Sequence, residues 1–303
     1  MIVRRTYHGL TWIDFDNPSP EEVSDVIKEF EIHPSAAQEL LSPSRRSKTD
    51  LYENFIYGVF HFPTTRSASK KPYLEIDFIV GKNFIVTSHY EDHNPLHEFG
   101  KVFEVNSLLD RNEMGSHAGY IFFYMMKRLY HALSDHMDHI EVELEAIEEA
   151  IFLQKEKEMV IALSKSSREL LDIKKTMSFH KETLASFAKG GKTLFGDEFG
   201  SYLEILQEDS AKIALDVRIN QDFVKELRDT NNSLLTTKQN EIMKFFTVIS
   251  FVTFPLALIV QILGFNSPYN PILGKPHDFW IIIGILGIVC ALMFLFFKRR
   301  RWI

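Results

Sequence analysis

Cysteine is nearly missing from this chain of 303 residues, because Cys290 is the single one. An intrachain disulfide is therefore excluded, and cysteine usage says little about the compartment. The N-terminus has no long apolar segment, so we expect no signal peptide. The sequence also has no nucleophile–base arrangement, no catalytic carboxylate pair and no cofactor fingerprint. We therefore expect a protein that is not an enzyme.

Acidic residues are scarce towards the end of the chain. Residues 239–303 hold two acids against six lysines and arginines, which leaves 28 basic and 39 acidic residues, a net charge of −11, for residues 1–238. An acidic soluble part argues against nucleic acid as a partner and is compatible with cations.

Two long apolar runs close the chain, at 245–263 and 279–297, and each has 19 residues. At ~1.5 Å per residue, a helix of this length spans about 28 Å, close to the ~30 Å hydrocarbon core of a lipid bilayer. Both runs are therefore predicted transmembrane helices. Basic residues at Lys238, Lys244 and 298–301 predict that both termini are cytoplasmic and that the loop between the spans faces outward. Two spans cannot enclose an aqueous path, so a pore requires several copies around an axis.

The pattern of residues 1–115 is typical of a compact cytosolic α/β domain. Ser19 and Pro20 predict the start of a helix, with Ser19 as its cap. Strands are expected over 10–15, 55–62, 74–80 and 83–89, with a hairpin turn at 81–83.

Helix-forming residues dominate from about Ser116. We expect a helical segment at 116–195, with one or two helices up to about residue 188 and the glycines at 190, 191 and 196 breaking the pattern. No proline lies between Gly196 and Pro255. This predicts a stalk helix within 196–263, roughly 65 residues long, that continues into the first span.

An apolar stripe at three- and four-residue spacing follows the stalk from Leu203 to Leu234, and it includes Ser210, Asn220 and Asn231. The polar members suit a ring of helices around a wet axis. The alternative is a helix that packs on its own domain and tolerates these polar positions.

One face of the first span is smaller or more polar than the opposite face. This pore stripe contains Asn240, Met243, Phe246 or Thr247, Ser250, Phe254, Ala257 and Gln261. Polar side chains at membrane depth usually face a pore or a partner helix. Met243, Phe246 and Phe254 are the expected hydrophobic gate. Helix–helix packing is the alternative interpretation, and Pro255 predicts a kink in the middle of the span.

The first span ends in Gly264-Phe265-Asn266. A glycine at this point lets the backbone turn the last helical carbonyls towards an axis. Asn266 amides from several copies can hydrogen-bond the water shell of a cation. Because Mg²⁺ loses its water reluctantly, a ring of oxygen atoms that holds the hydrated ion suits it.

These segments resemble the CorA-type divalent metal transporters over nearly the whole chain. The resemblance rests on residues 12–14, 32–34, 40–41, 57–62, 240–244, 255–256, 264–266 and 298–302. It implies a homopentameric funnel in the bacterial inner or plasma membrane, with passive influx of Mg²⁺ and with Co²⁺ or Ni²⁺ as other cargoes. It also implies that Asn266, Asn240 and Asp229 line the ion path.

The implied architecture is an α+β (α/β) cytosolic domain followed by a long stalk helix and two C-terminal transmembrane helices. An outer loop at 264–278 and a basic cytosolic tail at 298–303 complete the predicted order.

The chain departs from the family pattern in two places. Phe265 replaces the usual methionine, and residues 270–273 of the outer loop carry no acid, so that Asp278 is the only acid near the pore mouth. Relatives with such variants include zinc transporters. A ZntB-like Zn²⁺ transporter, with or without proton coupling, is therefore one alternative. A membrane-anchored signalling or scaffold protein without conduction is the other.

Additional metal sites are conceivable in the cytosolic part. The resemblance implies regulatory divalent ions between cytosolic domains, for which the acidic candidates are Glu91, Asp92, Glu208 and Asp209. His131, Asp135 and His139 have the spacing to chelate Zn²⁺ from one helix face, although such faces are more often only solvated.

Overall fold

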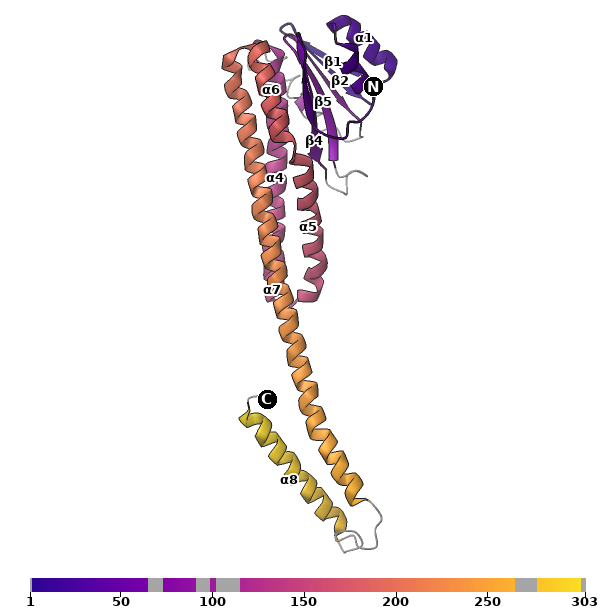
Figure 1. The fold of residues 1–303 in the computed structure, drawn as a ribbon, viewed down its shortest axis with the longest axis vertical. Coiled ribbons are helices and arrows are strands. Elements are labelled where there is room, and N and C mark those ends of the chain that lie inside the picture. Colours follow the sequence, from indigo (N-terminus) through magenta and orange to yellow (C-terminus); the bar gives the residue numbers. More distant parts are fainter. Residues whose placement is uncertain (1, 65–72, 91–98, 102–114, 265–276, 301–303) are drawn as a thin grey trace. The chain divides into compact units, whose positions relative to one another are not determined.

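The computed structural model describes residues 2–64, 73–90, 99–101, 115–264 and 277–300. Contacts divide the chain into two compact units, Met1–Arg228 and Asp229–Ile303. The first unit holds a β-sheet and most of the helices (Figure 1). The second unit holds the end of the longest helix and the last helix.

The first unit is built on a six-stranded sheet with the strand order β1-β2-β6-β5-β4-β3. Its strands are β1 (Ile2–Tyr7), β2 (Leu10–Asp16), β3 (Lys48–Leu51), β4 (Phe55–Pro63), β5 (Tyr73–Gly81) and β6 (Phe84–His89). β2 and β6 are parallel, and the other neighbours are antiparallel. The four predicted strands and the hairpin between β5 and β6 are confirmed. The two edge strands, β1 and β3, escaped prediction because they are short and rich in polar residues.

Helices α1 (Pro20–Phe30) and α2 (Pro34–Glu39) cover one face of the sheet. The predicted cap is confirmed, since the Ser19 hydroxyl accepts the Glu22 backbone N–H and the Glu22 carboxylate accepts the Ser19 N–H. This reciprocal pair satisfies two otherwise unpaired donors of the first helical turn. Val23 and Val26 then face a core that includes Phe15 and Val86.

The other face of the sheet packs on helices through a set of buried aromatic rings. Phe60 and Phe78 lie beside Phe122 of α4 (Ala118–Phe152), and Phe122 stacks on Phe187 of α6 (His180–Phe195) at 4.0 Å between ring centroids. Helix α5 (Glu156–Met177) lies between α4 and α6 in the chain. The segment therefore contains three helices, where the sequence predicted one or two.

Of the three glycines expected to break the helical pattern, Gly190 and Gly191 lie inside α6 instead, whereas Gly196 ends this helix as predicted. A Cβ on Gly191 would lie 2.5 Å from Leu203 Cδ1, and one on Gly190 would lie 2.3 Å from Leu51 Cδ2. Both glycines are buried. The prediction of a break at Gly190 and Gly191 was wrong, because these two glycines allow close packing of α6 against its neighbours.

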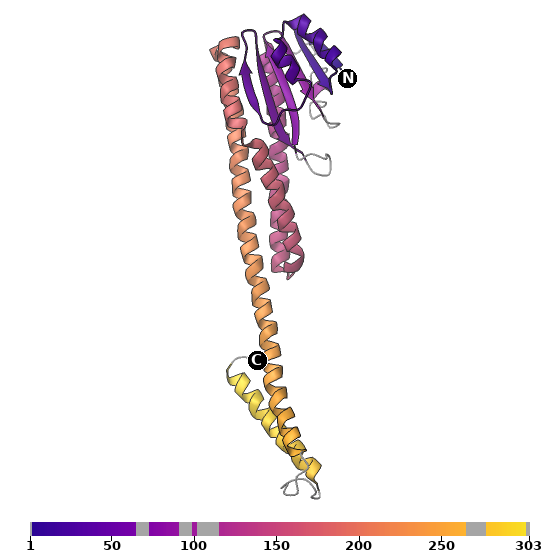
Figure 2. The same ribbon diagram turned by 45° about the vertical axis from the view of Figure 1, so that its right-hand side comes forward.

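Helix α7 (Asp197–Leu263) has 67 residues, which confirms the predicted long helix, and Pro255 lies inside it. In the first unit α7 runs beside α4 (Figure 2). Lys127 Nζ of α4 lies 2.8 Å from Asp209 Oδ2, and Lys174 of α5 donates to Gln221 at 2.9 Å. The stalk stripe from Leu203 to Leu227 is buried in this unit. It therefore packs on its own domain, and the interpretation of a wet axis along this stripe was wrong.

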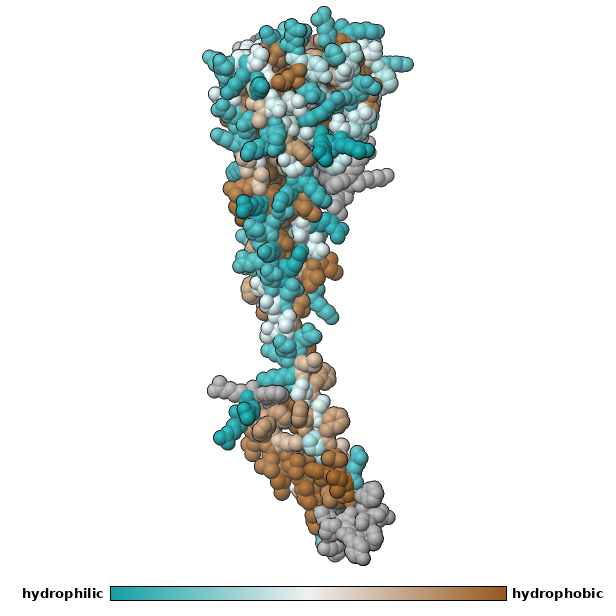
Figure 3. All heavy atoms as spheres, in the orientation of Figure 1, coloured by the Kyte–Doolittle hydropathy of each residue, from teal (hydrophilic) through white to brown (hydrophobic). Residues whose placement is uncertain are grey.

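The second unit contains α7 from residue 229 onwards and α8 (Asp278–Arg299). Both helices are long and apolar enough to cross a membrane. Only 6% of the apolar window in α7 is buried, and none of the window in α8 is. Hydrophobic residues accordingly cover most of the surface of these two segments (Figure 3). Such exposure is unlike the core helix of a soluble protein and suits contact with lipid.

Candidate functional site

The predicted pore stripe lies on one exposed face of α7. Its members recur every three or four residues, which places them on the same side of a helix with ~3.6 residues per turn. Of the two alternatives at one level, Phe246 is exposed and Thr247 is half-buried, and the other members are all exposed: Asn240, Met243, Ser250, Phe254, Ala257 and Gln261. The structure thus brings these residues together as a continuous strip along the apolar part of α7.

The opposite side of α7 is partly covered. Its less exposed residues are Val248, Val252, Pro255, Ile259 and Leu263. The last helix has a matching set at the same spacing: Ile282, Ile285, Leu286, Val289, Met293 and Phe297. Val248 and Phe297 are the two buried residues of these segments, at 8% and 7% exposure. The pairing of α7 with α8 therefore uses the face that points away from the pore stripe.

Polar groups on the pore stripe differ in their partners. The Ser250 hydroxyl donates to the Phe246 carbonyl at 2.9 Å, and its oxygen can still accept a hydrogen bond. Asn240 and Gln261 have no side-chain hydrogen-bond partner among the described residues. An amide without a protein partner can hydrogen-bond water or a hydrated ion.

Bulky apolar side chains alternate with these polar ones. Met243, Phe246 and Phe254 are 62%, 60% and 75% exposed. Rings of such side chains, contributed by copies of one helix, form constrictions that exclude water. The pore stripe therefore carries both polar and bulky apolar side chains.

The mouth of the first span is only partly described. The Gly264 N–H donates to the Val260 carbonyl at 2.9 Å, so the helical hydrogen bonding of α7 extends to this glycine. Phe265 and Asn266 lie outside the described residues. Asp229, at the start of the second unit, is exposed.

The acids predicted as regulatory metal ligands are not brought together in the described part of one chain. Asp209 is engaged with Lys127 at 2.8 Å, Glu208 is exposed, and Glu91 and Asp92 fall in the stretch that is not described. His131 Nδ1 and Asp135 Oδ1 lie 3.1 Å apart on an exposed helix face. No group of three His, Cys, Asp or Glu residues able to hold a metal ion occurs within the described ranges.

A buried polar cluster in the sheet has no counterpart in the sequence predictions. His61 Nε2 lies 3.3 Å from Glu75 Oε2, and the Tyr90 hydroxyl donates to Asp77 Oδ2 at 2.9 Å. Burial raises the pKa of the Asp77 carboxyl well above its ordinary value, and the neighbouring Glu75 raises this pKa further. The alternation of Glu75 and Asp77 with apolar residues in β5 was a signal of an inward-facing acid pair.

Comparison with known proteins identifies a family that this chain matches over nearly its whole length. Residues 7–299 match the family described as "CorA-like Mg²⁺ transporter protein". The cobalt/magnesium transport protein CorA of Thermotoga maritima is 25% identical over 299 residues, which are 97% of this chain and 83% of that protein. The complete structure of the CorA magnesium transporter from Methanocaldococcus jannaschii superposes with a TM-score of 0.84 at 19% identity, covering 99% of this chain and 94% of that chain.

Another solved structure that resembles this chain contains a cytoplasmic domain alone. The cytoplasmic domain of ZntB from Vibrio parahaemolyticus has a TM-score of 0.61 at 10% identity and covers 75% of this chain and 88% of that chain. At such low identity, the likeness concerns the fold alone. The family match, by contrast, includes the soluble domain, the long helix and both apolar helices. The chain therefore belongs to the CorA-like Mg²⁺ transporter family, and it is a membrane transporter rather than an enzyme.

Proposed function

We propose that five copies of this chain form a pore through which Mg²⁺ crosses the membrane, with Co²⁺ and Ni²⁺ as further cargoes. The observation that carries this proposal is the exposed pore stripe of α7, which lies opposite the face that packs on α8. In a symmetric ring, α8 then takes the lipid side, and the five stripes line the axis. The relative from Thermotoga maritima is named a cobalt/magnesium transport protein, in agreement with this choice of cargo.

Gly264, Phe265 and Asn266 form the outer filter in this proposal. Mg²⁺ requires octahedral coordination at ~2.1 Å and keeps several of its waters. Five Asn266 amides would therefore hold the hydrated ion through those waters. Gln261, Ala257 and Ser250 follow along the strip, and Asn240 and Asp229 continue the path on the cytoplasmic side.

Phe246, Phe254 and Met243 act as the gate. Five phenylalanine rings at one level of the pore leave an apolar constriction that water and hydrated ions do not enter. The gate opens when the helices move apart. Acids between neighbouring cytosolic domains, with Glu91, Asp92, Glu208 and Asp209 as candidates, are the proposed site where cargo ions hold it closed.

The orientation follows from charge. Lys298, Arg299 and the two arginines after them adjoin the end of α8, which favours a cytoplasmic C-terminus, and the soluble first unit lies on the same side. A membrane potential that is negative inside then drives cations inward, by ~2.3 kcal/mol per elementary charge and 100 mV. No other source of energy is needed for accumulation.

Flux into liposomes tests the choice of cargo. We expect the purified chain to carry Mg²⁺ and Co²⁺ in the absence of a proton gradient. Zn²⁺ is included in the flux assay because Phe265 replaces the methionine that is usual at this position. Zn²⁺ flux that depends on a pH gradient, without Mg²⁺ flux, would replace our proposal by a zinc transporter. Absence of flux for Mg²⁺, Co²⁺, Ni²⁺ and Zn²⁺ alike would leave a scaffold protein.

A further inference from the structure

A short segment between α2 and β3 lies on the surface of the first unit and is tied to the sheet by polar contacts. Residues 41–46 form this strap, which runs between the buried Leu40 and Ser47. All of its residues are exposed except Ser44, which is half-buried. Apolar burial therefore contributes little to holding the strap, and its hydrogen bonds decide how firmly it lies on the sheet.

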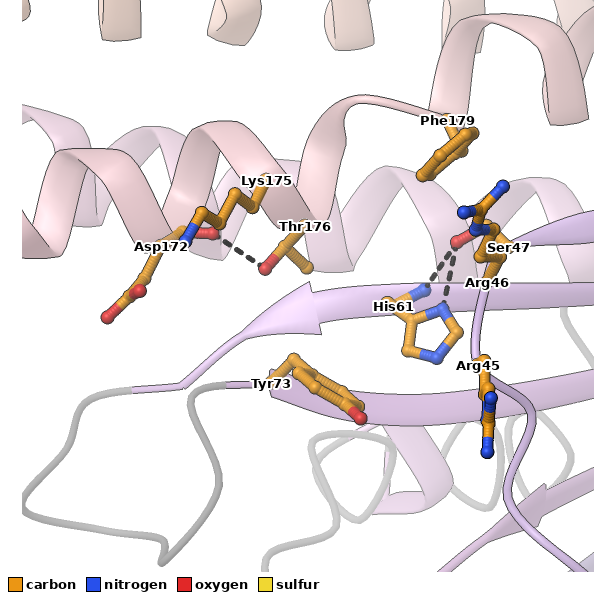
Figure 4. A pocket seen from close by; sticks show the side chains of 9 residues that line it. All are labelled: Arg45, Arg46, Ser47, His61, Tyr73, Asp172, Lys175, Thr176 and Phe179. Carbon is orange, nitrogen blue, oxygen red and sulfur yellow. Dashed lines mark hydrogen bonds between the residues drawn. The ribbon is translucent and has the colours of Figure 1, made fainter.

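The contacts of the strap involve two buried side chains of the sheet, His61 and Glu75. The Ser44 N–H donates to Glu75 Oε1 at 2.6 Å, and the Ser44 carbonyl lies 3.1 Å from His61 Nε2. Just after the strap, the Ser47 hydroxyl accepts the His61 backbone N–H at 3.1 Å and lies 3.0 Å from His61 Nδ1 (Figure 4). His61 and Glu75 are directly opposite each other on β4 and β5. The middle of the strap thus depends on this pair.

A second buried acid, Asp77, lies beside Glu75 on the same face of the sheet, because residues two apart in a strand point to the same side. The Tyr90 hydroxyl donates to Asp77 Oδ2 at 2.9 Å and to the carbonyl of Glu39, the last residue of α2, at 3.4 Å. Asp77 therefore acts on the start of the strap through Tyr90 and on its middle through Glu75.

The two carboxyl groups each keep one oxygen without a hydrogen bond. Asp77 Oδ1 and Glu75 Oε2 have no hydrogen-bond partner among the described residues, and the same holds for the buried hydroxyls of Tyr57 and Ser88. Ser88 stands directly opposite Asp77 on β6. Two carboxylates side by side in a buried site repel each other. One proton between them supplies the missing hydrogen bond and removes one of the two charges.

The titratable and charged groups that face this acid pair come from the neighbouring strands and from α2: His61 and Tyr57 of β4, Tyr90 after β6, Lys48 and Asp50 of β3, and Glu39. Lys48 is paired with the last two of these acids. Burial raises the pKa of the Asp77 carboxyl well above its ordinary value, and Glu75 raises this pKa further, while the two tyrosine hydroxyls lower it in part. The neutral form of Asp77 therefore suits the closed strap.

We propose that Glu75 and Asp77 share one proton and that this proton holds the strap on the sheet, so that the strap opens as the pH rises. Loss of the proton leaves two negative charges in a site sheltered from water. Lifting the strap lets water reach both carboxylates, which relieves their repulsion and breaks the Ser44 contacts. The closed form binds one proton more than the open form. Rising pH therefore favours opening between the ordinary pKa of an aspartate, ~4, and the raised pKa of Asp77. This switch lies in the first unit and does not rest on the proposed function.

Hydrogen–deuterium exchange of the full chain in detergent tests the switch, measured by mass spectrometry on a peptide that contains Ser44. After division by the intrinsic exchange rate at each pH, the protection of this peptide should fall about tenfold per pH unit from pH 5 until the pH passes the raised pKa of Asp77. Asp77→Asn keeps the shape of the side chain but has no carboxyl proton to lose, so its protection should not follow the pH. Asp25→Asn removes the same charge from an exposed position of α1 and, as the matched control, should behave as the wild type does.

The proposal is overturned if the protection of this peptide in the wild type does not change with pH. It is also overturned if Asp77→Asn shows the same pH dependence as the wild type. Infrared spectroscopy of the wild type, in a detergent without carbonyl groups, adds a measurement that needs no variant. The carbonyl stretch of one protonated carboxylic acid should persist to a higher pH than that at which the other carboxyl groups ionise. Loss of this band together with all the others would also overturn the shared proton.

Discussion

At the scale of single residues, the surroundings of His180 strongly change the chemistry of its imidazole. Its Nδ1 accepts the Tyr130 hydroxyl at 2.8 Å, and its Nε2–H donates to the His61 carbonyl at 2.7 Å. The rings of Phe60 and Phe62 pack on it edge-to-face. Burial lowers the pKa of this imidazole to about 4, so the neutral form is the one that joins α6 to the sheet and to α4.

This pKa predicts acid sensitivity. The unfolded chain takes up a proton at His180 near pH 6.5, but the folded protein does so only near pH 4. The stabilisation is therefore complete above the higher value and is lost as the pH falls towards the lower one, by roughly 3 kcal/mol. We expect the thermal midpoint to fall from pH 7 to pH 4.5 and His180→Gln to flatten this dependence.

Asp77 acts in the opposite direction, because its raised pKa makes acid favour the folded state. The wild type and His180→Gln both contain Asp77, so its effect cancels when their midpoints are compared. Equal slopes of midpoint against pH in the wild type and in His180→Gln would contradict the assignment of the acid sensitivity to this histidine.

At the scale of elements, one substitution in α6 distinguishes two roles for Gly191, as a helix breaker or as a site of close packing. The two roles predict opposite changes in stability for Gly191→Ala. If Gly191 broke the helix, Gly191→Ala would stabilise the protein by about 1 kcal/mol, the difference in helix propensity. The structure instead puts the new Cβ 2.5 Å from the buried Leu203. Overpacking costs ~1–3 kcal/mol, so we expect net destabilisation.

Thermal unfolding of the detergent-solubilised protein measures this sign. Ser186→Ala, on the exposed side of the same helix, serves as the control and should leave the midpoint unchanged or slightly higher. A rise of the midpoint in Gly191→Ala would restore the helix-breaking role of the glycine.

The gate is a property of α7 as an element. Phe254→Ala removes a large ring from the pore stripe, and we expect faster flux with weaker closure by Mg²⁺, by about tenfold, because the dewetted constriction widens. Ile259→Ala removes a side chain of similar character from the face towards α8 and should alter flux much less. Tracer uptake into liposomes measures both. Equal effects of the two substitutions would contradict the assignment of Phe254 to the pore axis.

Sequence patterns predicted the positions of single helices and strands better than they predicted which elements pack against one another. Strand alternation and the Ser19 cap gave four strands and the first helix correctly, because both signals are local. The stalk stripe from Leu203 to Leu227 was correctly placed on one helix face, yet its partner was misjudged. Periodicity shows that a face is buried but does not say by what, and here α4 and α5 of the same chain cover it.

A pocket with several basic lining residues, between the end of α5 and the segment before β3, was missed for a related reason (Figure 4). Arg45 and Arg46 are adjacent in the sequence, but Lys175 of α5 and Phe179 of the turn after it come more than a hundred residues later. Only the folded chain brings them together. All members of the pore stripe, in contrast, belong to one helix, so the stripe could be predicted from the spacing of its residues in the sequence.

At the scale of the whole molecule, the account requires an assembly. One chain offers a single pore stripe, and a closed path needs that stripe repeated around an axis. With chains of 35.2 kDa, a pentamer has a protein mass of about 176 kDa. Light scattering of the detergent-solubilised protein, corrected for bound detergent, should give this mass. A monomer or dimer under conditions that support flux would contradict the five-fold arrangement.

The most direct test of the central claim is Mg²⁺ uptake by liposomes that contain Asn266→Ala, under an inside-negative potential. We predict that uptake falls at least about tenfold, because the amides that hold the hydrated ion are lost. Asn83→Ala, the same substitution at an exposed turn of the first unit, should keep wild-type uptake. Wild-type rates in Asn266→Ala would contradict a filter at Gly264-Phe265-Asn266.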